Sequence, residues 1–593
     1  MNLTFRGLVF ALSVAVGVGC SSTSVTTNTY PAPKVIDGGA NGPMGTGGTG
    51  VTLPAPMSGE GNVLLFKGPA QMLGHGSPCT NEIGATADRW CAFISPSTSS
   101  LGRIDLFVIN VSRAAAGVAI SCAGGIVDPN CLKLTGGFFE EPSTPFPHAA
   151  GFQGDTLIYF DSTGAGYGWR PGMANGRVLV ADGTGSVHDC VPSVKGTSVL
   201  CQKTLDPQPI DGLTQNDLMV GKLDAATDPP LTRVDTVISN DGSLQASQQH
   251  FRVGFSPDGE YVAWSSAATQ GGVEILKTQK VGDDRTRVTV ATDVSRWSFS
   301  PDGTHWYWLS KFNYDIAGMR SGILQTAPFA DGSAATTLLP SVGEFTVARS
   351  GAIVARAMVS MAHGDLKGIP DPIGAPAIIN TLDTGVVGFL SVGPKGHVAY
   401  TKNVDSLFQV VDLYVKKLDG TGAACSLTTQ ANGQRSLFFL PGGGGVVWAQ
   451  ITNLDTASVS DPFIVRESFT RLSDCTTVAV ATNIGSYGIA GDDSVLIEDE
   501  FDGVEGTLRI RKVNAGETLG DGPSVLLQTR VNDYVPLTPA PGVVLFTVSA
   551  DSLSDGLYLH PLGAAAPAGS DAGIASPDGG SGSAPDAGQP DGV

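Results

Sequence analysis

Short apolar runs separated by turn residues fill the chain between residues 62 and 562, without the long 3.6-residue periodicity of amphipathic helices. The clearest segments, 251–264 and 297–308, each place a tight turn between two apolar runs. Pro presets φ at the first corner, Asp bonds to the nearby backbone, and Gly takes the positive φ that closes the connection. We therefore predict two antiparallel hairpins whose turns are formed by Ser256, Pro257, Asp258 and Gly259 and by Ser300, Pro301, Asp302 and Gly303.

Looser copies of the same hairpin follow at regular intervals. Their predicted strand centres are Ala263, Tyr307, Val354, Ala399, Val447, Leu496 and Leu545, which are 44, 47, 45, 48, 49 and 49 residues apart. A period in the forties with four short strands per repeat is typical of a β-propeller blade. One blade cannot bury both of its faces alone, so we predict an all-β propeller in which neighbouring blades cover one another.

The segment 62–249 also contains strand-like runs, but their spacing is irregular. Counting them gives ten candidate hairpins, which exceeds the usual four to eight blades, so we estimate seven or eight blades and leave the remainder as decorations. Residues 250–562 form the regular part. The run Val63 to Phe66 is placed to complete the last blade beside Leu557 to Leu559 and so to close the ring. A twisted β-sandwich is the alternative, but it does not explain equally spaced copies.

The two complete Ser-Pro-Asp-Gly turns, each followed by a short apolar strand, resemble the TolB-like propeller repeat, a relative of the WD repeat. The resemblance covers about residues 250–562. It implies a propeller of four-stranded blades. TolB also carries an α/β domain before its propeller, which has no counterpart in this sequence, so membership of the Tol complex does not follow.

Residues 1–20 have the pattern of an export signal, with Arg6 before an apolar stretch that is too short to span a bilayer. The ending Gly17-Val18-Gly19-Cys20-Ser21 resembles the lipobox of bacterial lipoproteins, although Gly17 replaces the usual Leu or Val. The resemblance implies lipidation at Cys20, and Ser21 in place of Asp implies the outer membrane. An ordinary secretory signal that is cleaved away with Cys20 is the alternative.

Two segments outside the propeller are predicted to be disordered. Residues 21–61 are rich in Ser, Thr, Gly and Pro, and residues 563–593 are rich in Gly, Ala, Pro and Asp. Neither can bury enough apolar surface to offset the entropy of ordering. We expect a flexible tether and an acidic tail.

After export, eight cysteines enter an oxidising compartment, where disulfides are the default state. Closeness in sequence favours pairing Cys79 with Cys91, Cys122 with Cys131, and Cys190 with Cys201, which leaves Cys425 and Cys475. A metal or redox site is the competing interpretation. It calls for Cys-x-x-Cys or Cys/His clusters, and the chain has no Cys-x-x-Cys. We expect no metal and no cofactor.

The chain of 593 residues has 35 Lys and Arg against 55 Asp and Glu, a formal net charge of −20. Such a charge opposes binding to nucleic acid, which requires clustered cations. No Gly-x-Ser-x-Gly, His-Glu-x-x-His or P-loop is present, and no catalytic residue is identified. His188 with Asp189 is too sparse to support a site, and His305 and His397 are expected to be exposed structural residues.

These patterns favour a non-enzymatic, monomeric envelope lipoprotein, facing the periplasm or the cell surface, whose propeller binds another envelope protein. The alternative is an enzyme, a lyase or hydrolase, or a lectin-like binder that acts on a carbohydrate or small molecule at the propeller axis. The enzyme requires carboxylates or His from several blades to converge there. Fold alone does not decide between these functions.

Overall fold

The computed structural model describes residues 61–562 with gaps in the connecting segments. The gaps are 74–77, 81–87, 98–103, 123–127, 139–150, 161–164, 181–186, 194, 205–213, 224–230, 240–251, 268–273, 315–319, 330–334, 361, 406–409, 433–436, 452–464, 483, 490–494, 500–505, 515–517, 520–523, 538–541 and 549–554. The predicted signal with Cys20, the tail, and the linker up to residue 60 lie outside the described residues.

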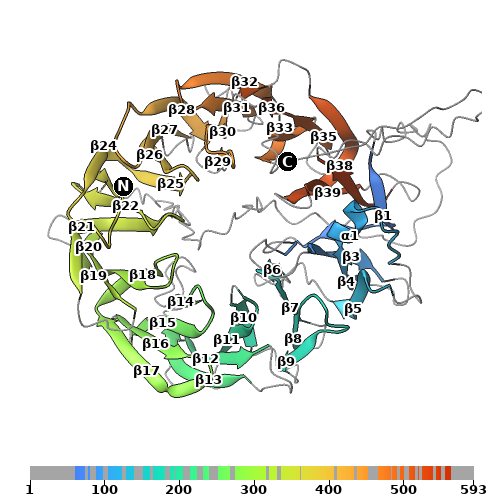
Figure 1. Cartoon of the computed structure of the whole chain (residues 1–593), viewed down its shortest axis with the longest axis horizontal. Coiled ribbons are helices and arrows are strands. Elements are labelled where there is room, and N and C mark those ends of the chain that lie inside the picture. The colour runs from blue at the N-terminus through green and yellow to red at the C-terminus, as the bar shows by residue number, and fades with distance from the viewer. Residues whose placement is uncertain are drawn as a thin grey trace, which may run out of the picture.

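The described strands form antiparallel four-stranded units arranged as a ring (Figure 1). Four sheets contain four strands each, and the three larger sheets divide into two units apiece where the pairing passes from one set of strands to the next. In two of these, one long strand is shared: β21 (Thr336–Val347) ends one unit and begins the next, as does β38 (Val525–Leu537). We number the units from 1 to 10 in ring order.

The bounds of the elements are as follows. Unit 1 contains β2 (Gln71–Met72), β3 (Trp90–Pro96), β4 (Ile104–Asn110) and β5 (Cys131–Phe138); unit 2, β6 (Gly151–Gln153), β7 (Thr156–Phe160), β8 (Gly166–Trp169) and β9 (Arg177–Val180); unit 3, β10 (Val187–Pro192), β11 (Ser198–Thr204), β12 (Thr214–Lys222) and β13 (Thr232–Ser239). Unit 4 contains β14 (Arg252–Phe255), β15 (Tyr261–Ala267), β16 (Glu274–Lys280) and β17 (Asp283–Thr292); unit 5, β18 (Val294–Phe299), β19 (His305–Tyr314), β20 (Arg320–Pro328) and the start of β21; unit 6, the end of β21, β22 (Ile353–Met358), β23 (Gly364–Ile369) and β24 (Asn380–Val386). Unit 7 contains β25 (Gly388–Val392), β26 (His397–Asp405), β27 (Val410–Lys417) and β28 (Cys425–Asn432); unit 8, β29 (Phe438–Phe439), β30 (Gly445–Ile451), β31 (Val465–Arg471) and β32 (Thr476–Thr482). Unit 9 contains β33 (Ile484–Ile489), β34 (Val495–Asp499), β35 (Gly506–Arg511) and the start of β38; unit 10, the end of β38, β39 (Val543–Val548), β40 (Gly556–Pro561) and β1 (Val63–Lys67). Outside the units lie α1 (Val111–Ala115) and the pair β36 (Val513–Asn514) and β37 (Thr518–Leu519).

This arrangement is a β-propeller, as the repeat predicted. The described pairing yields ten units, more than the seven or eight blades estimated from the sequence. The difference arises upstream, where the irregular hairpins of units 1 to 3 form sheets with four strands each rather than decorations.

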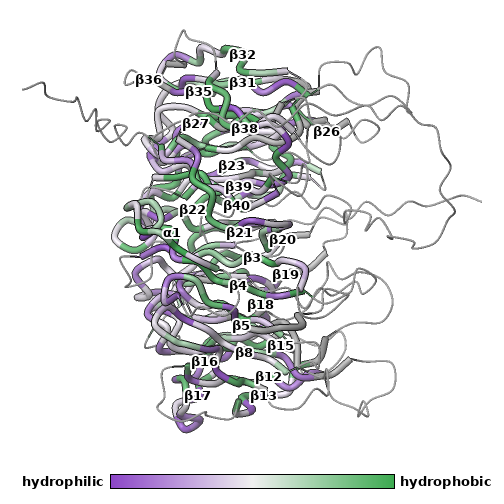
Figure 2. The backbone as a smooth tube through the Cα atoms, turned by 90° about the vertical axis from the view of Figure 1, so that its right-hand side faces the viewer, coloured by the Kyte–Doolittle hydropathy of each residue, from purple (hydrophilic) through white to green (hydrophobic). Residues whose placement is uncertain are grey.

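The hydrophobic core is divided among the seams between neighbouring units. Each of the ten buried clusters in the described residues combines side chains from two adjacent units. Viewed edge-on, hydrophobic and hydrophilic segments are interspersed through the thickness of the ring (Figure 2). Trp297, Trp306 and Trp308 lie in the cluster between units 4 and 5, so they pack in a seam, as their alternation along the strands indicated.

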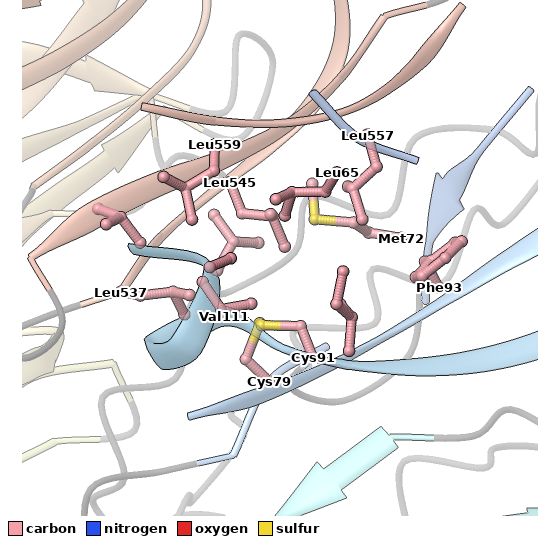
Figure 3. Packing of buried hydrophobic residues seen from close by; sticks show 14 of the residues in the cluster. Leu65, Met72, Cys79, Cys91, Phe93, Val111, Leu537, Leu545, Leu557 and Leu559 are labelled. Carbon is pink, nitrogen blue, oxygen red and sulfur yellow. A yellow bond between two sulfur atoms is a disulfide. The ribbon is translucent and has the colours of Figure 1, made fainter. Parts of the chain in front are cut away.

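The ring closes through β1. Val63 pairs with Leu559 and Leu64 with Tyr558, so the strand completes unit 10 from the other end of the sequence. In Figure 3, Leu65 of this strand meets Leu557 and Leu559 of unit 10 and Met72 of unit 1 in one buried cluster. The closing contact predicted for this segment is therefore present.

One irregularity recurs in every unit. In the outermost strand, a β-bulge leaves one aliphatic residue without a partner in the third strand: Leu134, Leu179, Val234, Val290, Leu338, Leu382, Leu427, Val480, Leu527 and, in β1, Leu65. A bulge increases the local twist and interrupts the straight row of backbone groups at a sheet edge. The ten outer edges are thus poor templates for pairing with another chain.

Candidate functional site

The innermost strands surround the centre of the ring (Figure 1), and four consecutive units carry titratable residues at one register level there. The level is defined by pairing with the second strand: His188 pairs with Gln202, Arg252 with Ser265, Arg296 with Leu309, and Glu344 with Arg356. The corresponding residues of units 7, 9 and 10 are Gly388, Ser486 and Tyr534. We call the four residues of units 3 to 6 the charged arc. The side chains of His188 and Arg252 lie outside the described set, so these two residues are placed by backbone register.

The described centre of the arc is an ion pair at the inner end of unit 6. Nε of Arg356 lies 2.9 Å from Oε1 of Glu344, at an angle that makes no hydrogen bond, and Arg356 also donates to the backbone carbonyl of Val387. Glu344 is only 7% exposed. Burial raises the pKa of its carboxyl, while the positive charges of Arg356 and Arg296 act in the opposite direction.

Gly388 of unit 7 lies directly beside this carboxyl. A Cβ at Gly388 would stand 3.8 Å from Oε1 of Glu344, which places the two residues next to each other on adjacent units. The arc thus ends where unit 7 contributes no side chain.

A further acidic group lies on the innermost strand of unit 10. Asp533 keeps a solvent-exposed surface. Desolvation by the surrounding protein nevertheless raises the pKa of its carboxyl to about 6, against the opposing hydrogen bond from the backbone N–H of Tyr534. A carboxyl with this pKa exchanges its proton near neutral pH, which general acid–base chemistry requires.

The two turns singled out in the sequence lie between the first and second strands of units 4 and 5. In the first, the N–H of Gly259 donates to the carbonyl of Ser256 over 2.8 Å, and φ of Gly259 is 74°. In the second, the equivalent bond joins Gly303 and Ser300 over 2.9 Å, and φ of Gly303 is 71°. Pro257 and Pro301 occupy the first corners and Asp258 and Asp302 the second. Hydrogen bonds from Ser300 and the N–H of Thr304 lower the pKa of Asp302.

These turns are stacked around one rim of the ring. A Cβ on Gly259 would meet the Ser193 side chain of unit 3 at 3.3 Å, and one on Gly303 would meet Pro257 of unit 4 at 3.5 Å. Ser193 opens a turn of the same kind, closed by a 2.7 Å bond from the N–H of Gly196. The turns of neighbouring units therefore contact one another along this rim and support the innermost strands.

Eight cysteines form four disulfides, which are the three pairs favoured by closeness in sequence and the pair of the two cysteines that remained. Cys79–Cys91 and Cys122–Cys131 lie in unit 1, Cys190–Cys201 joins the first two strands of unit 3, and Cys425–Cys475 joins units 7 and 8. Four disulfides indicate that the chain folds in an oxidising compartment.

The histidines after two of the turns differ in burial. His305 is partly exposed, whereas His397 is 9% exposed, so the expectation that both are exposed is wrong for His397. Among the described residues no group of three or more His, Cys, Asp or Glu is placed to hold a metal ion. No helix of the described part is long and apolar enough to cross a membrane.

Two acidic residues bridge seams instead of facing the centre. Asp235, next to the bulge in unit 3, accepts hydrogen bonds from Trp264 and Lys277 of unit 4, both at 2.8 Å. Asp383, at the same position in unit 6, accepts from Tyr400 and Lys402 of unit 7. These contacts fasten neighbouring units and are structural.

Sequence reasoning missed the charged arc, although a signal was present. Arg252, Arg296 and Glu344 each stand four residues before the first residue of their turn, at 256, 300 and 348. Aligning the repeats on their turns would have brought the three together. His188 stands five residues before Ser193 because β10 holds an extra residue between its paired positions.

The comparisons with known proteins give the following results. No family model and no curated protein matches the chain. Solved structures with similarity include a eukaryotic initiation factor, with 11% identity, 74% of this chain and 97% of that chain covered, and a TM-score of 0.41. They also include a prolyl endopeptidase, with 12% identity, 61% and 53% coverage and a TM-score of 0.35. An oligogalacturonate lyase from Vibrio parahaemolyticus has 10% identity, 63% and 97% coverage and a TM-score of 0.29. Likeness at this level carries no information about activity.

Proposed function

We propose that the protein binds a small carboxylate-bearing ligand at the centre of its ring, against the charged arc. The supporting observation is the ion pair between Arg356 and the buried carboxylate of Glu344, on which the positive charge of a second guanidinium group, that of Arg296, also acts. Two guanidinium groups thus act on one carboxylate at the inner end of the ring, in a chain whose net charge is −20. A guanidinium matches the planar geometry of a carboxylate and recognises it through two parallel hydrogen bonds.

The test is titration calorimetry of the purified protein with acidic oligosaccharides and with their uncharged counterparts. Acidic members are expected to bind, and Arg296→Ala should weaken binding at least tenfold because a charge-assisted contact contributes about 1.5–3 kcal/mol. Arg287→Ala is the matched control, since Arg287 lies on the outermost strand of unit 4, beside the ring of Trp264. Equal binding of charged and neutral ligands, or equal affinity of both variants, contradicts the proposal.

A catalytic role is a second candidate, and Asp533 favours it. Its carboxyl, with a pKa of about 6, lies one residue before Tyr534, which is at the level of the charged arc. If the bound ligand is turned over, Asp533→Asn should remove turnover while leaving binding intact. Unchanged turnover in this variant would exclude Asp533 as the acid or base.

The envelope role predicted from the sequence is kept within this proposal. Lipid on Cys20 would hold the ring at the outer membrane through the 21–61 linker, with about 0.8 kcal/mol contributed by each buried CH₂. Cys20→Ser should then shift the protein from the membrane fraction to the soluble one. Unchanged fractionation would contradict lipid anchoring at Cys20.

Binding of an envelope protein partner on one side of the ring is a third candidate. The connections on the two sides differ: the segment 452–464 between β30 and β31 spans 13 residues, whereas the tight turns hold five or fewer. Crosslinking followed by recovery from envelope extracts tests this role. Deletion of 455–461 should abolish capture of the partner, and capture that survives the deletion places the contact elsewhere.

A further inference from the structure

The third strands of the units share one residue position that fills the seam to the next unit. At this position, the third strand pairs with the outer-strand residue that directly follows the bulged residue. The position is leucine in eight units: Leu106, Leu218, Leu276, Leu324, Leu366, Leu413, Leu508 and Leu557. Each of these leucines is at most 3% exposed. The position therefore belongs to the seam core.

Two units depart from leucine, and one departure has a packing explanation. Unit 2 has Gly166, where a Cβ would stand 2.8 Å from the ring of Phe160, so the phenylalanine occupies the space instead. Unit 8 has Glu467, which is fully buried. A buried carboxyl is costly unless it is paired or hydrogen-bonded.

Glu467 has neither kind of support from its own sheet. Its neighbours on the flanking strands are Ala449 and Ala481, and neither of its carboxylate oxygens has a hydrogen-bond partner in the described part of the chain. The seam around it is apolar and includes Val447, Val465, Phe469, Ile484, Val495 and Ile497. None of these side chains titrates.

The charged group that acts on Glu467 comes from unit 9. Arg511, on β35, reaches across the seam and donates to the carbonyl of Val480, the bulged residue of unit 8, over 3.3 Å. Burial raises the pKa of Glu467 well above its usual value, and the charge of Arg511 opposes this shift without cancelling it. Asp499, at the end of β34, lies outside the residues whose side chains are described.

Unit 8 is held differently on its two sides. Toward unit 7, Cys425 at the start of β28 is bonded to Cys475 just before β32. Toward unit 9, the seam contains the buried carboxyl of Glu467, and Arg511 of unit 9 donates a hydrogen bond to the carbonyl of Val480. If unit 8 separates from a neighbour, we therefore expect it to separate from unit 9 and not from unit 7.

We propose that Glu467 is a proton-dependent latch on the seam between units 8 and 9. With the carboxyl neutral, the side chain is tolerated at the leucine position and the seam is closed. When the carboxyl is ionised, hydration of the carboxylate lowers its free energy. The seam then opens locally, while the disulfide holds unit 8 to unit 7. The latch is independent of the ligand proposed for the ring centre.

The sign of the effect follows from linkage. An acid whose pKa is higher in the folded state than in the unfolded state binds its proton more tightly when folded. Its contribution to stability is full below the unfolded pKa, near 4.3, and falls as pH rises toward the folded pKa. Raising the pH therefore weakens this seam.

Hydrogen exchange with mass spectrometry on the full chain tests the latch at pH 5 and pH 9, with rates corrected for the intrinsic effect of pH. In the unmodified protein, protection of β31 to β35 should fall at least tenfold at the higher pH relative to units 3 to 6. Glu467→Leu, which restores the residue of the eight other units, should abolish this difference. Glu467→Gln, which keeps the shape without the charge, should do the same and decides the question if the leucine variant does not fold.

Glu344→Gln is the matched control, because it removes a buried carboxyl from the charged arc of unit 6, away from the seam between units 8 and 9. It should leave the response of β31 to β35 unchanged. The proposal is overturned if the loss of protection persists in Glu467→Gln, if it is spread evenly over all units, or if Glu344→Gln abolishes it equally.

Discussion

Units 1 to 3 and units 4 to 10 reach the same fold by different means. Upstream, the innermost strands β2 and β6 have two and three residues, and three of the four disulfides lie in units 1 and 3. Downstream, the glycine turn that unit 3 also has recurs, the innermost strands β14, β18, β25 and β33 have four to six residues although β29 has two, and the one remaining disulfide joins two units. Both regions nevertheless keep the outer bulge and, with two exceptions, the buried leucine of the third strand. The turn is thus the variable part of the repeat, and the seam is the constant part.

The largest expected effect tests whether the seam position is equivalent in both regions. Leu218→Ala in unit 3 and Leu508→Ala in unit 9 should each destabilise the protein by about 3 kcal/mol, because both leucines are fully buried. Urea denaturation measures the cost. Val288→Ala, at a 54% exposed position, should be nearly neutral. If only one of the leucine variants lost less than about 1 kcal/mol of stability, the seam position would not be equivalent in the two regions.

Removing a disulfide tests the dependence of the upstream units on covalent support. Cys79→Ser with Cys91→Ser opens a link between residues 12 apart and should cost about 3 kcal/mol on the chain-entropy model. We expect hydrogen exchange to increase first in β2 and β3, since β2 pairs through only two residues. Cys425→Ser with Cys475→Ser serves as comparison and should increase exchange at the seam of units 7 and 8. Identical exchange maps for the two variants would contradict this division.

Turn glycines that all have positive φ but different surroundings sharpen the comparison at the rim. A Cβ on Gly196 of unit 3 would lie 2.2 Å from side-chain oxygens of Asp155 and Thr156, whereas one on Gly303 has its nearest contact at 3.5 Å and one on Gly351 has none within 4 Å. All three have positive φ. Valine should therefore cost most at Gly196, about 1–2 kcal/mol at Gly303, and least at Gly351. Thermal melting gives the order, and a reversed order would mean that neighbouring turns do not constrain one another.

The smallest expected effect concerns Asp235 of unit 3 and Asp383 of unit 6, whose carboxylates bridge seams at equivalent positions in the two regions. Burial raises the pKa of Asp235 and of Asp383, but hydrogen bonds from Lys277 with Trp264 and from Lys402 with Tyr400 outweigh it and leave both below the usual value. A lowered pKa contributes stability that is present above the unfolded pKa near 3.9 and is lost as pH falls through the folded pKa. Asp235→Asn and Asp383→Asn should each cost about 1–2 kcal/mol at pH 7 and little at pH 2. A constant cost across this range would contradict an ionic role.

The sequence predicts the repeat where residues near one another in the chain determine the local structure. Ser-Pro-Asp-Gly specifies a turn through its own backbone preferences, and apolar runs at a period near 47 specify buried strands, so the propeller and the closing strand were predicted. Units 1 to 3 were underestimated because their turns are long or contain different residues, while their pairing depends on contacts that no local pattern reveals.

The charged arc and Glu467 required the register of the strands. Arg296 and Glu344 lie 48 residues apart, and only pairing with the second strand shows that they share a level. Glu467 is unremarkable in sequence, since a strand at a surface often contains glutamate. Its significance appears only when the leucines at the same position of eight other units are aligned through their bulges.

Completion of unit 10 by β1 sets the order of biogenesis. The strand that leaves the ribosome among the first has its partner, β40, almost 500 residues later, as the 498-residue separation of Asn62 and His560 across this junction shows. During synthesis, the hydrophobic residues of β1 have no finished sheet to join until β40 has emerged. Circularisation is consequently the final step of maturation, and a nascent chain halted before residue 556 would remain an open arc.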